Sequence, residues 1–456
     1  MSISAIPVPK LSARHLQFIA LGGAIGSGLF LGSAEGIHTA GPALLLAYAL
    51  TGAIIFFIAR ALGQMALEEP RDGSFSAYAG EYLGPGFGFV TGWVYLLGAI
   101  IGGMAELTAI GVLMHFWWPA LPQWIPALVA LAMLYAINRL GARAFGEAEF
   151  WLASIKILTI LALIAIGTAL LLVGYRNGEI DANVANFWRY GGLLPAGGSS
   201  LVGVLPIAFF AFGGIEMIGL AAAEAENPEK TLPKAINGLI LRILVFYIGA
   251  LAIVLALIPW PQIAPDVSPF VTVFDKIGIP GAAGLFNFVV ITAILSSCNS
   301  ALFAVGRLMR ALAVRGQAPG WLAPLDRRGV PARAIRLLMA IQLGTVGLNY
   351  LVPAQAFGLL VISAAVPLLW TWAMIVLAHL RRRHRCGGDE AGTPLRMPLA
   401  PVSNYVVILF ILGVLATMAA NEHLRLPTLL GLGWIVGLAA IYMVFLRAAG
   451  SVQRRA

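Results

Sequence analysis

The sequence predicts an all-α integral membrane protein with twelve transmembrane helices, on the strength of three observations. First, 60% of the 456 residues are apolar, only 11% are charged, and the mean hydropathy is +0.90, a balance that soluble domains of this size do not have. Second, apolar windows of about 20 residues, the length that crosses a bilayer, recur along the whole chain. Third, Lys and Arg gather in alternate connections between these windows. Large soluble domains are therefore excluded.

The predicted spans are bounded by Pro, Gly and charged residues. An even number of spans returns both ends of the chain to one side of the membrane. The first 13 residues are polar and lack a cleavable apolar core, so we expect a cytoplasmic tail there rather than a signal peptide. In order, the spans are 16–36, 42–66, 86–114, 124–138, 150–174, 198–222, 237–258, 281–306, 335–352, 355–379, 402–420 and 427–446.

The basic residues predict the orientation. With a cytoplasmic N-terminus, 24 of the 29 Lys and Arg residues fall in cytoplasmic connections, tails or adjacent helix ends, and Lys156 falls inside a span. The positive-inside rule therefore predicts cytoplasmic N- and C-termini. Nucleic acid is not an expected partner, because the basic residues are scattered over many loops without interleaved aromatics. The four basic residues predicted outside are Arg176, Arg189, Lys276 and Arg425.

Cysteine and histidine usage argues against redox, metal and enzyme chemistry. Cys298 lies in an apolar window and Cys386 in a basic loop, so we expect neither a disulfide framework nor a four-ligand zinc site. No metal and no cofactor is expected. An intramembrane enzyme stays a remote alternative, because the histidines fall in tails, loops or helix ends. Those histidines are His15, His38, His115, His379, His384 and His423.

Two of the spans contain helix-breaking sequences at membrane depth. Residues 22–28 read GGAIGSG in the first span, and residues 209–216 read FFAFGGIE in the sixth. Glycine permits an unwound backbone, whose freed N–H and C=O groups must find partners in a cavity or a ligand. The alternative is a seam of small residues for helix packing. Because the two breaks are five spans apart, they predict a transporter of two inverted five-helix repeats with helices 1 and 6 unwound.

This arrangement divides the chain into seven segments. We expect the repeats to be followed by two C-terminal helices, with a periplasmic loop between the repeats. The segments are a cytoplasmic tail (1–13), the first repeat (14–174), the periplasmic loop (175–197), the second repeat (198–380), a basic cytoplasmic loop (381–401), the last two spans (402–447) and a cytoplasmic tail (448–456).

The two breaks also predict what the site binds. Free N–H groups near Ser27, at the start of a half-helix, suit a carboxylate. Carbonyl groups released at Ala24, Phe210 and Gly213 suit an ammonium group. An α-amino acid carries both groups, although a sodium ion would also fit the carbonyl groups.

Three ionisable residues inside spans are candidates for coupling, because each is costly in a membrane unless it is paired or lines a cavity. Glu106 shares one face of the third span with the small residues Gly98, Gly102 and Ala109, and we expect this face to pack inward. Lys156, in the fifth span, is either functional or a cation that is structural or snorkels to the cytoplasmic surface. Glu216 either braces the second break or carries a proton.

Polar and aromatic residues near the breaks complete the predicted pocket. Thr108, Ser297 and Asn299 together with Phe210 would accept a neutral side chain, whereas an ionised Glu106 would favour a cationic one. The polar run 296–300 either lines the pathway or joins helices by hydrogen bonds. Phe210 and Phe212 are candidate gates, because a bulky ring over a small ligand can close it off. Charged residues at 141–149 and 224–234 are expected to form cytoplasmic caps.

Seven different short motifs follow one another along the chain. They are RHLQ (14–17), ALGGAIGSGLF (20–30), AGPA (40–43), EPRDGSF (69–75), GEAEFW (146–151), FGGIE (212–216) and GVP (329–331).

These motifs resemble those of bacterial amino acid permeases, the amino acid transporter family of the amino acid, polyamine and organocation superfamily. The resemblance runs from Arg14 to about Arg447. It implies a LeuT-like fold and the transport of an amino acid such as an aromatic one, proline, threonine, serine, histidine, D-alanine or GABA.

The resemblance also assigns roles to residues. It implies that backbone N–H groups of Ser27 and Gly28 bind the substrate carboxylate and that carbonyls of Ala24, Phe210 and Gly213 bind the ammonium group. It makes Phe210 the occluding gate.

Two ionisable residues take coupling roles by the same resemblance. Lys156 stands where sodium-coupled relatives hold a cation, which implies proton coupling, and Glu106 tunes coupling or specificity. We therefore expect a proton-coupled symporter for a neutral L-amino acid in a bacterial inner membrane, with the lipid bilayer and the amino acid as its partners. An exchanger or uniporter for a basic amino acid or GABA is the alternative. The oligomeric state is not predicted.

Overall fold

The computed structural model describes residues 25–139, 142–222, 227–386 and 394–446. The predicted tails, 1–13 and 448–456, lie outside these residues, as does Ala24. The described chain is helical throughout, apart from turns, loops and one isolated bridge between Arg176 and Asp181.

Ten stretches of helix in the described chain are long and apolar enough to cross a bilayer, and each overlaps one of the predicted spans. The protein is therefore an all-helical membrane protein. Five of these stretches are single helices: α4 (Ala43–Glu68), α6 (Pro85–Met114), α17 (Ala282–Val314), α20 (Pro353–Arg385) and α21 (Val402–Ala420).

The other five stretches have a displaced start or an interruption. They are α8 (Ala142–Leu172), of which Gly146–Leu172 is the apolar part; α10 (Gly197–Gly203), α11 (Leu205–Phe212) and α12 (Met217–Ala222); α13 (Pro228–Asn237), α14 (Leu239–Arg242), the π-helix η1 (Ile243–Gly249) and α15 (Ala250–Leu257); α18 (Ala332–Gln342) and α19 (Gly344–Leu351); and α22 (Glu422–Ile441) with the π-helix η4 (Tyr442–Leu446).

Two predicted spans are not among these ten. The fourth is present as α7 (Trp124–Arg139), a shorter apolar helix of 16 residues. The first is described only from Ile25 onward, where α2 (Ser27–Phe30) leads into α3 (Gly32–Ala40).

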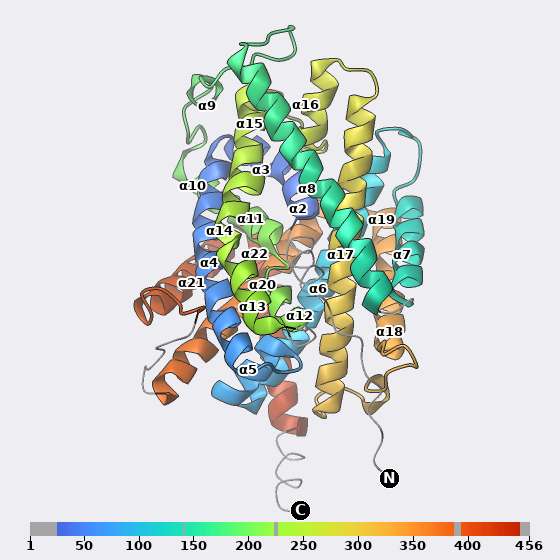
Figure 1. Cartoon of the computed structure of the whole chain (residues 1–456), viewed down its shortest axis with the longest axis vertical. Coiled ribbons are helices and arrows are strands. Elements are labelled where there is room, and N and C mark those ends of the chain that lie inside the picture. Colours follow the sequence, from blue (N-terminus) through green and yellow to red (C-terminus); the bar gives the residue numbers. More distant parts are fainter. Residues whose placement is uncertain (1–24, 140–141, 223–226, 387–393, 447–456) are drawn as a thin grey trace, which may run out of the picture.

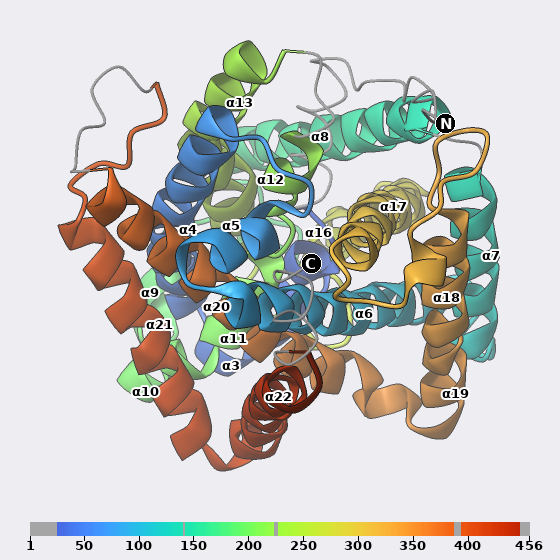
Figure 2. The same cartoon turned by 90° about the horizontal axis from the view of Figure 1, so that it is seen from below.

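Shorter helices mark the two ends of the bundle. Helices α9 (Asn186–Arg189) and α16 (Pro269–Ile277) lie at the upper end in Figure 1, and α5 (Ser74–Tyr82) and α13 lie at the lower end. Helix α8 crosses the bundle diagonally between these ends. Seen from below, α6, α17 and α20 lie near the centre, while α21 and α22 lie along one outer edge and α7, α18 and α19 along another (Figure 2). The central helices pack extensively, α6 against both α20 and α17.

The described part of the predicted first break, from Ile25 onward, lies close to the sixth span inside this bundle. Helix α11 ends at Phe212, Gly214 takes a positive φ of 103°, and α12 begins at Met217. In the first span Gly26 is extended (φ −132°, ψ −153°) and the helix begins at Ser27.

Helices α2 and α11 touch at Gly28. A β-carbon on Gly28 would lie 2.6 Å from the Cα of Ala211. Only glycine permits so close an approach of the two backbones.

Candidate functional site

A cavity lies beside the second break. It has about 80 Å³ of room for the centres of water molecules, which is space for several of them. The wall contains two carboxylates, Glu106 and Glu216, and no Lys or Arg among the described residues that line it. The remaining wall is mostly small or apolar. The lining residues are Tyr95, Gly98, Ala99, Gly102, Gly103 and Glu106 of α6, Phe210 of α11, Gly213, Gly214 and Glu216 of the break, Met217 of α12, Ser297 and Ala301 of α17, and Ala364, Pro367 and Leu368 of α20.

Glu106 joins the first break to the cavity. One carboxylate oxygen accepts a hydrogen bond from the backbone N–H of Ser27 at 3.0 Å, and the other accepts one from the Ser297 hydroxyl at 3.3 Å. A β-carbon on Gly26 would lie 2.3 Å from the same carboxylate, so the backbone approaches Glu106 closely here. The N–H group of Ser27, the first residue of α2, is therefore positioned to bind a carboxylate, and in this structure it binds one that belongs to the protein.

Glu216 holds the second break in shape. Its Oε1 accepts hydrogen bonds from the Gly214 N–H and the Tyr95 hydroxyl, both at 3.1 Å, and its Oε2 accepts one from the Trp372 indole at 3.2 Å. Glu216 is 3% exposed. The carboxylate thus links the turn to α6 and α20, as expected for a residue that braces the second break. Nothing in the sequence alone pointed to Tyr95 or Trp372.

We expect Glu216→Gln to destabilise the protein. A carboxamide has one NH₂ group, which would face either the Gly214 N–H or the Trp372 N–H, and a buried donor left unpaired costs about 1–3 kcal/mol. The thermal unfolding midpoint in detergent should fall by several degrees. An unchanged midpoint would contradict the bracing role.

Lys156 is buried, with 0% exposure, so the snorkelling alternative is wrong. Its ammonium group donates hydrogen bonds to the carbonyls of Ile25 at 3.0 Å and Ala293 at 3.2 Å. Lys156 therefore connects α8 to the first break and to α17. A fixed cation occupies a position lined by backbone carbonyl groups, which is the type of position where a free cation would also bind.

Glu149 is a buried ionisable residue that the sequence analysis missed. The fifth span was predicted to begin at 150, and 141–149 was expected to be a cytoplasmic cap, but α8 begins at Ala142 and Glu149 is fully buried in it. Ser296 donates a hydrogen bond to Glu149 at 2.6 Å, and Asn299 donates a longer one at 3.5 Å. The signal that was available was the seven-residue spacing of Glu149 from Lys156, which places both on one face of a helix.

Five predicted pocket or gate residues lie outside the set of described residues that line the cavity: Ser27, Gly28, Thr108, Asn299 and Phe212. Ser27 donates its N–H to Glu106 of the cavity wall, and Gly28 packs against Ala211. Thr108 accepts a hydrogen bond from Asn349 at 2.7 Å. Asn299 accepts one from Asn138 at 2.9 Å and belongs to the Glu149 network. Phe212 stacks on Tyr247, with ring centroids 4.4 Å apart. Ala24, a further predicted contact, lies outside the described residues.

Phe210 lies between the cavity and a wider one towards the upper end of the bundle. It lines the central cavity and also packs in a small apolar cluster with Ile207, Leu360 and Phe357. Phe357 in turn lines the wider cavity, which is bordered by α3, the end of α6, α17 and α20. The aromatic ring is thus part of the apolar layer that separates the two cavities.

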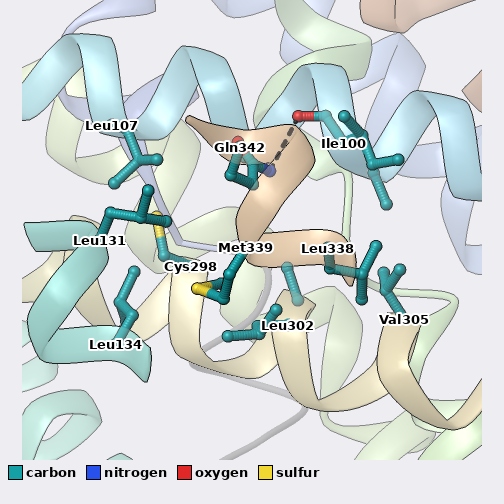
Figure 3. A pocket seen from close by; sticks show the side chains of 13 residues that line it. Ile100, Leu107, Leu131, Leu134, Cys298, Leu302, Val305, Leu338, Met339 and Gln342 are labelled. Atoms are coloured by element: carbon teal, nitrogen blue, oxygen red, sulfur yellow. Dashed lines mark hydrogen bonds between the residues drawn. The ribbon is translucent and has the colours of Figure 1, made fainter. Parts of the chain in front are cut away.

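A second apolar pocket adjoins the central cavity. Figure 3 shows side chains of α6, α7, α17 and α18 pointing into it, with the Gln342 amide donating a hydrogen bond to the Ile100 carbonyl at 3.1 Å. This apolar pocket and the central cavity share Ala99, Gly103 and Ala301 in their walls. Only glycine and alanine therefore appear in the shared part of the wall.

Sequence comparison identifies the class of protein that carries this site. The family profile described as "Amino acid permease" matches residues 15–450. The chain belongs to the amino acid permease family. This permease is 44% identical to the aromatic amino acid transport protein AroP of Escherichia coli K12, over 97% of this chain and 96% of AroP. It is 44% identical to the uncharacterized amino acid permease YtnA of Bacillus subtilis, over 95% and 94% of the two chains, and 42% identical to the probable threonine/serine transporter YbxG of that organism, over 95% and 94%. The chain is thus an amino acid transporter and not an enzyme.

Proposed function

We propose that this permease is a proton-coupled symporter that takes up a neutral L-amino acid by alternating access. The observation that carries the proposal is the buried ammonium group of Lys156 on the carbonyls of Ile25 and Ala293. A fixed positive charge there would repel a free sodium ion, because like charges interact strongly where little water is present. The proton is then the coupling ion, carried by a carboxyl group near Lys156.

The main chain of the substrate would bind at the two breaks. Its carboxylate would take the N–H groups of Ser27 and Gly28, and its ammonium group would lie near the carbonyls of Phe210 and Gly213, with Ala24 as a further carbonyl. Because Glu106 accepts the Ser27 N–H, the substrate carboxylate must displace it. Protonation of Glu106 weakens its hold on that N–H, and this links proton binding to substrate binding.

A neutral side chain is favoured by the cavity wall. The lining beyond the two carboxylates is mostly small or apolar, and Glu216 already accepts three hydrogen bonds. The names of AroP and YbxG point to aromatic and to threonine or serine substrates, all of which have neutral side chains. An exchanger or uniporter for a basic amino acid or GABA is the second candidate, because an ionised Glu106 in the wall would attract a cation.

The proposed architecture is a LeuT-like fold with twelve spans. Two inverted five-helix repeats, 14–174 and 198–380, would each begin with a broken helix, followed by the two helices of 402–447. The break in the sixth span and the start of α2 at Ser27, inside the predicted first span, support this proposal. The α5 and α13 end of the bundle carries Arg71, Lys230 and Lys234, and we place it in the cytoplasm of a bacterial cell by the positive-inside rule, with the protein in the inner membrane.

Phe210 is the proposed gate, and Phe210→Ala should weaken occlusion of the substrate. Removing the ring opens the apolar layer between the two cavities, so we expect the apparent KM for uptake to rise by about tenfold, with a smaller change in maximal rate. Initial-rate uptake over a range of substrate concentrations measures both. A normal KM would indicate that Phe210 packs in the core and is not a gate.

Uptake by the purified protein in liposomes tests the proposed function. A panel of radiolabelled amino acids would be supplied without sodium, with and without an inward proton gradient. Accumulation of a neutral amino acid that depends on the gradient supports the proposal. Counterflow against preloaded substrate with no response to the gradient would instead identify an exchanger, and accumulation of only lysine, arginine or GABA would favour the second candidate.

A further inference from the structure

One short segment of α17, residues 293–299, contacts all three buried charges around the first break. The Ala293 carbonyl accepts a hydrogen bond from Lys156, Ser296 donates to Glu149, and Ser297 donates to Glu106. Ser296 and Ser297 are consecutive, so two hydroxyl groups on neighbouring residues each hold one carboxyl group. This explains the polar run in an otherwise apolar span.

Glu149 lies on the side of Lys156 that is opposite to the centre of the span. It precedes Lys156 by seven residues, which is two helical turns or about 10 Å along α8. Helix α8 runs from the α9 end of the bundle at Leu172 towards its start near α7 and α18 (Figure 1). The direction from Lys156 to Glu149 is therefore away from the α9 end.

The charges of the three residues do not balance when all are ionised. Lys156 interacts electrostatically with both Glu106 and Glu149, and all three side chains are buried, Glu106 being 8% exposed and the other two 0%. One ammonium and two carboxylates leave a net negative charge in a membrane-embedded site, which is costly. A single added proton makes the group neutral.

We propose that Glu149 is the second carboxyl group of a one-proton site, and that it receives the transported proton from Glu106 and releases it on the cytoplasmic side. This inference rests on the proposed proton coupling. When Glu106 holds the proton, Glu149 is the carboxylate that balances Lys156. Glu106 then loses its proton, its carboxylate regains the Ser27 N–H, and Glu149 becomes the neutral acid. Glu149 finally gives the proton to water, which leaves the group with one net negative charge until Glu106 takes up the next proton. Lys156 keeps its charge throughout.

The surroundings of Glu149 suit this role. Ser296 and Asn299 of α17 contact the carboxyl group directly, and Asn138 of α7 supports Asn299 with a hydrogen bond at 2.9 Å. These partners are neutral, so their own charge does not change with the protonation state of Glu149. In the described part of the chain, the other titratable groups with electrostatic interactions in this cluster are Cys298 of α17, with Lys156 and Glu106, and Tyr247 of η1, with Glu106.

The test is Glu149→Gln in liposomes, with two kinds of transport measured on the same preparation. Gln keeps the volume and can accept the Ser296 hydrogen bond, but it cannot carry a proton. We expect accumulation driven by an inward proton gradient to fall by about tenfold or more, while counterflow exchange of the same amino acid stays within about twofold of wild type. Glu147→Gln is the control, because Glu147 is a half-buried glutamate on the same helix. This variant should preserve both accumulation and exchange.

Glu149→Asp separates a proton-carrying role from a packing role. Asp is a shorter side chain that retains the acid, so it should accumulate more substrate than Glu149→Gln. Normal accumulation in Glu149→Gln, loss of exchange together with accumulation, or better accumulation by Gln than by Asp would each overturn the inference. If the wild-type protein itself ignores the proton gradient, the proposed function fails, and the inference fails with it.

Discussion

Lys156→Met is expected to abolish gradient-driven uptake. Methionine is similar in length and fits an apolar interior, but it leaves the carbonyls of Ile25 and Ala293 without their ammonium donor and the carboxyl groups of Glu106 and Glu149 without their counter-charge. Removing one member of a buried charge cluster costs about 3–5 kcal/mol unless the remaining charges are neutralised. Both carboxyl groups should therefore become protonated, and the site would no longer exchange its proton.

Uptake and counterflow assays in liposomes would check this prediction, with a thermal unfolding midpoint to confirm that the variant is folded. Lys234→Met, at an exposed position on α13, is the matched control and should leave uptake unchanged. Uptake by Lys156→Met with the normal dependence on pH would show that the ammonium group is not part of coupling. A folded variant that exchanges but does not accumulate substrate is the expected result.

Gly28→Val is expected to remove substrate binding and uptake altogether. The added β-carbon would lie 2.6 Å from the Cα and 2.9 Å from the backbone N of Ala211, and 2.9 Å from the ring of Phe210. Backbone atoms cannot move out of the way as a flexible side chain can, so α2 and α11 must separate. Separation displaces both the N–H groups proposed for the substrate carboxylate and the ring proposed as the gate.

Scintillation proximity binding and uptake with the transported amino acid would measure the effect. Gly433→Val in α22 is the matched control, because a β-carbon there meets nothing within 4 Å. The control should behave as wild type. Retained binding in Gly28→Val would mean that the substrate carboxylate binds elsewhere than at the first break.

The membrane class and most spans follow from the sequence alone. Apolar length and bounding polar residues predicted windows that overlap the ten long apolar helices, because a bilayer requires about 20 apolar residues in a row whatever the tertiary contacts are. The break of the sixth span at 213–216 was predicted as well, since Gly-Gly is a local helix-breaking signal. The amino acid permease family was recognisable from short motifs in order.

The predicted pocket residues were only partly brought together. Phe210, Gly213 and Ser297 line the cavity, whereas Thr108 and Asn299 face other helices. Residues two positions apart on a helix point in very different directions, and this separates Ser297 from Asn299. Which direction faces the cavity depends on how α17 is rotated against its neighbours, and that rotation is not encoded in any one span.

The roles of the buried charges were decided by tertiary structure. Sequence placed Lys156 inside a span but left snorkelling open, and it placed Glu149 in a cap because a run of charges usually ends a membrane helix. The folded chain brings residues 293–299 of α17 against both, supplying a carbonyl group for the ammonium and a hydroxyl group for the carboxylate. The sequence by itself determined which segments enter the membrane, since that depends on local transfer free energy. Only the tertiary structure decided which buried charges meet, because their cost is offset by partners more than 100 residues away in the chain.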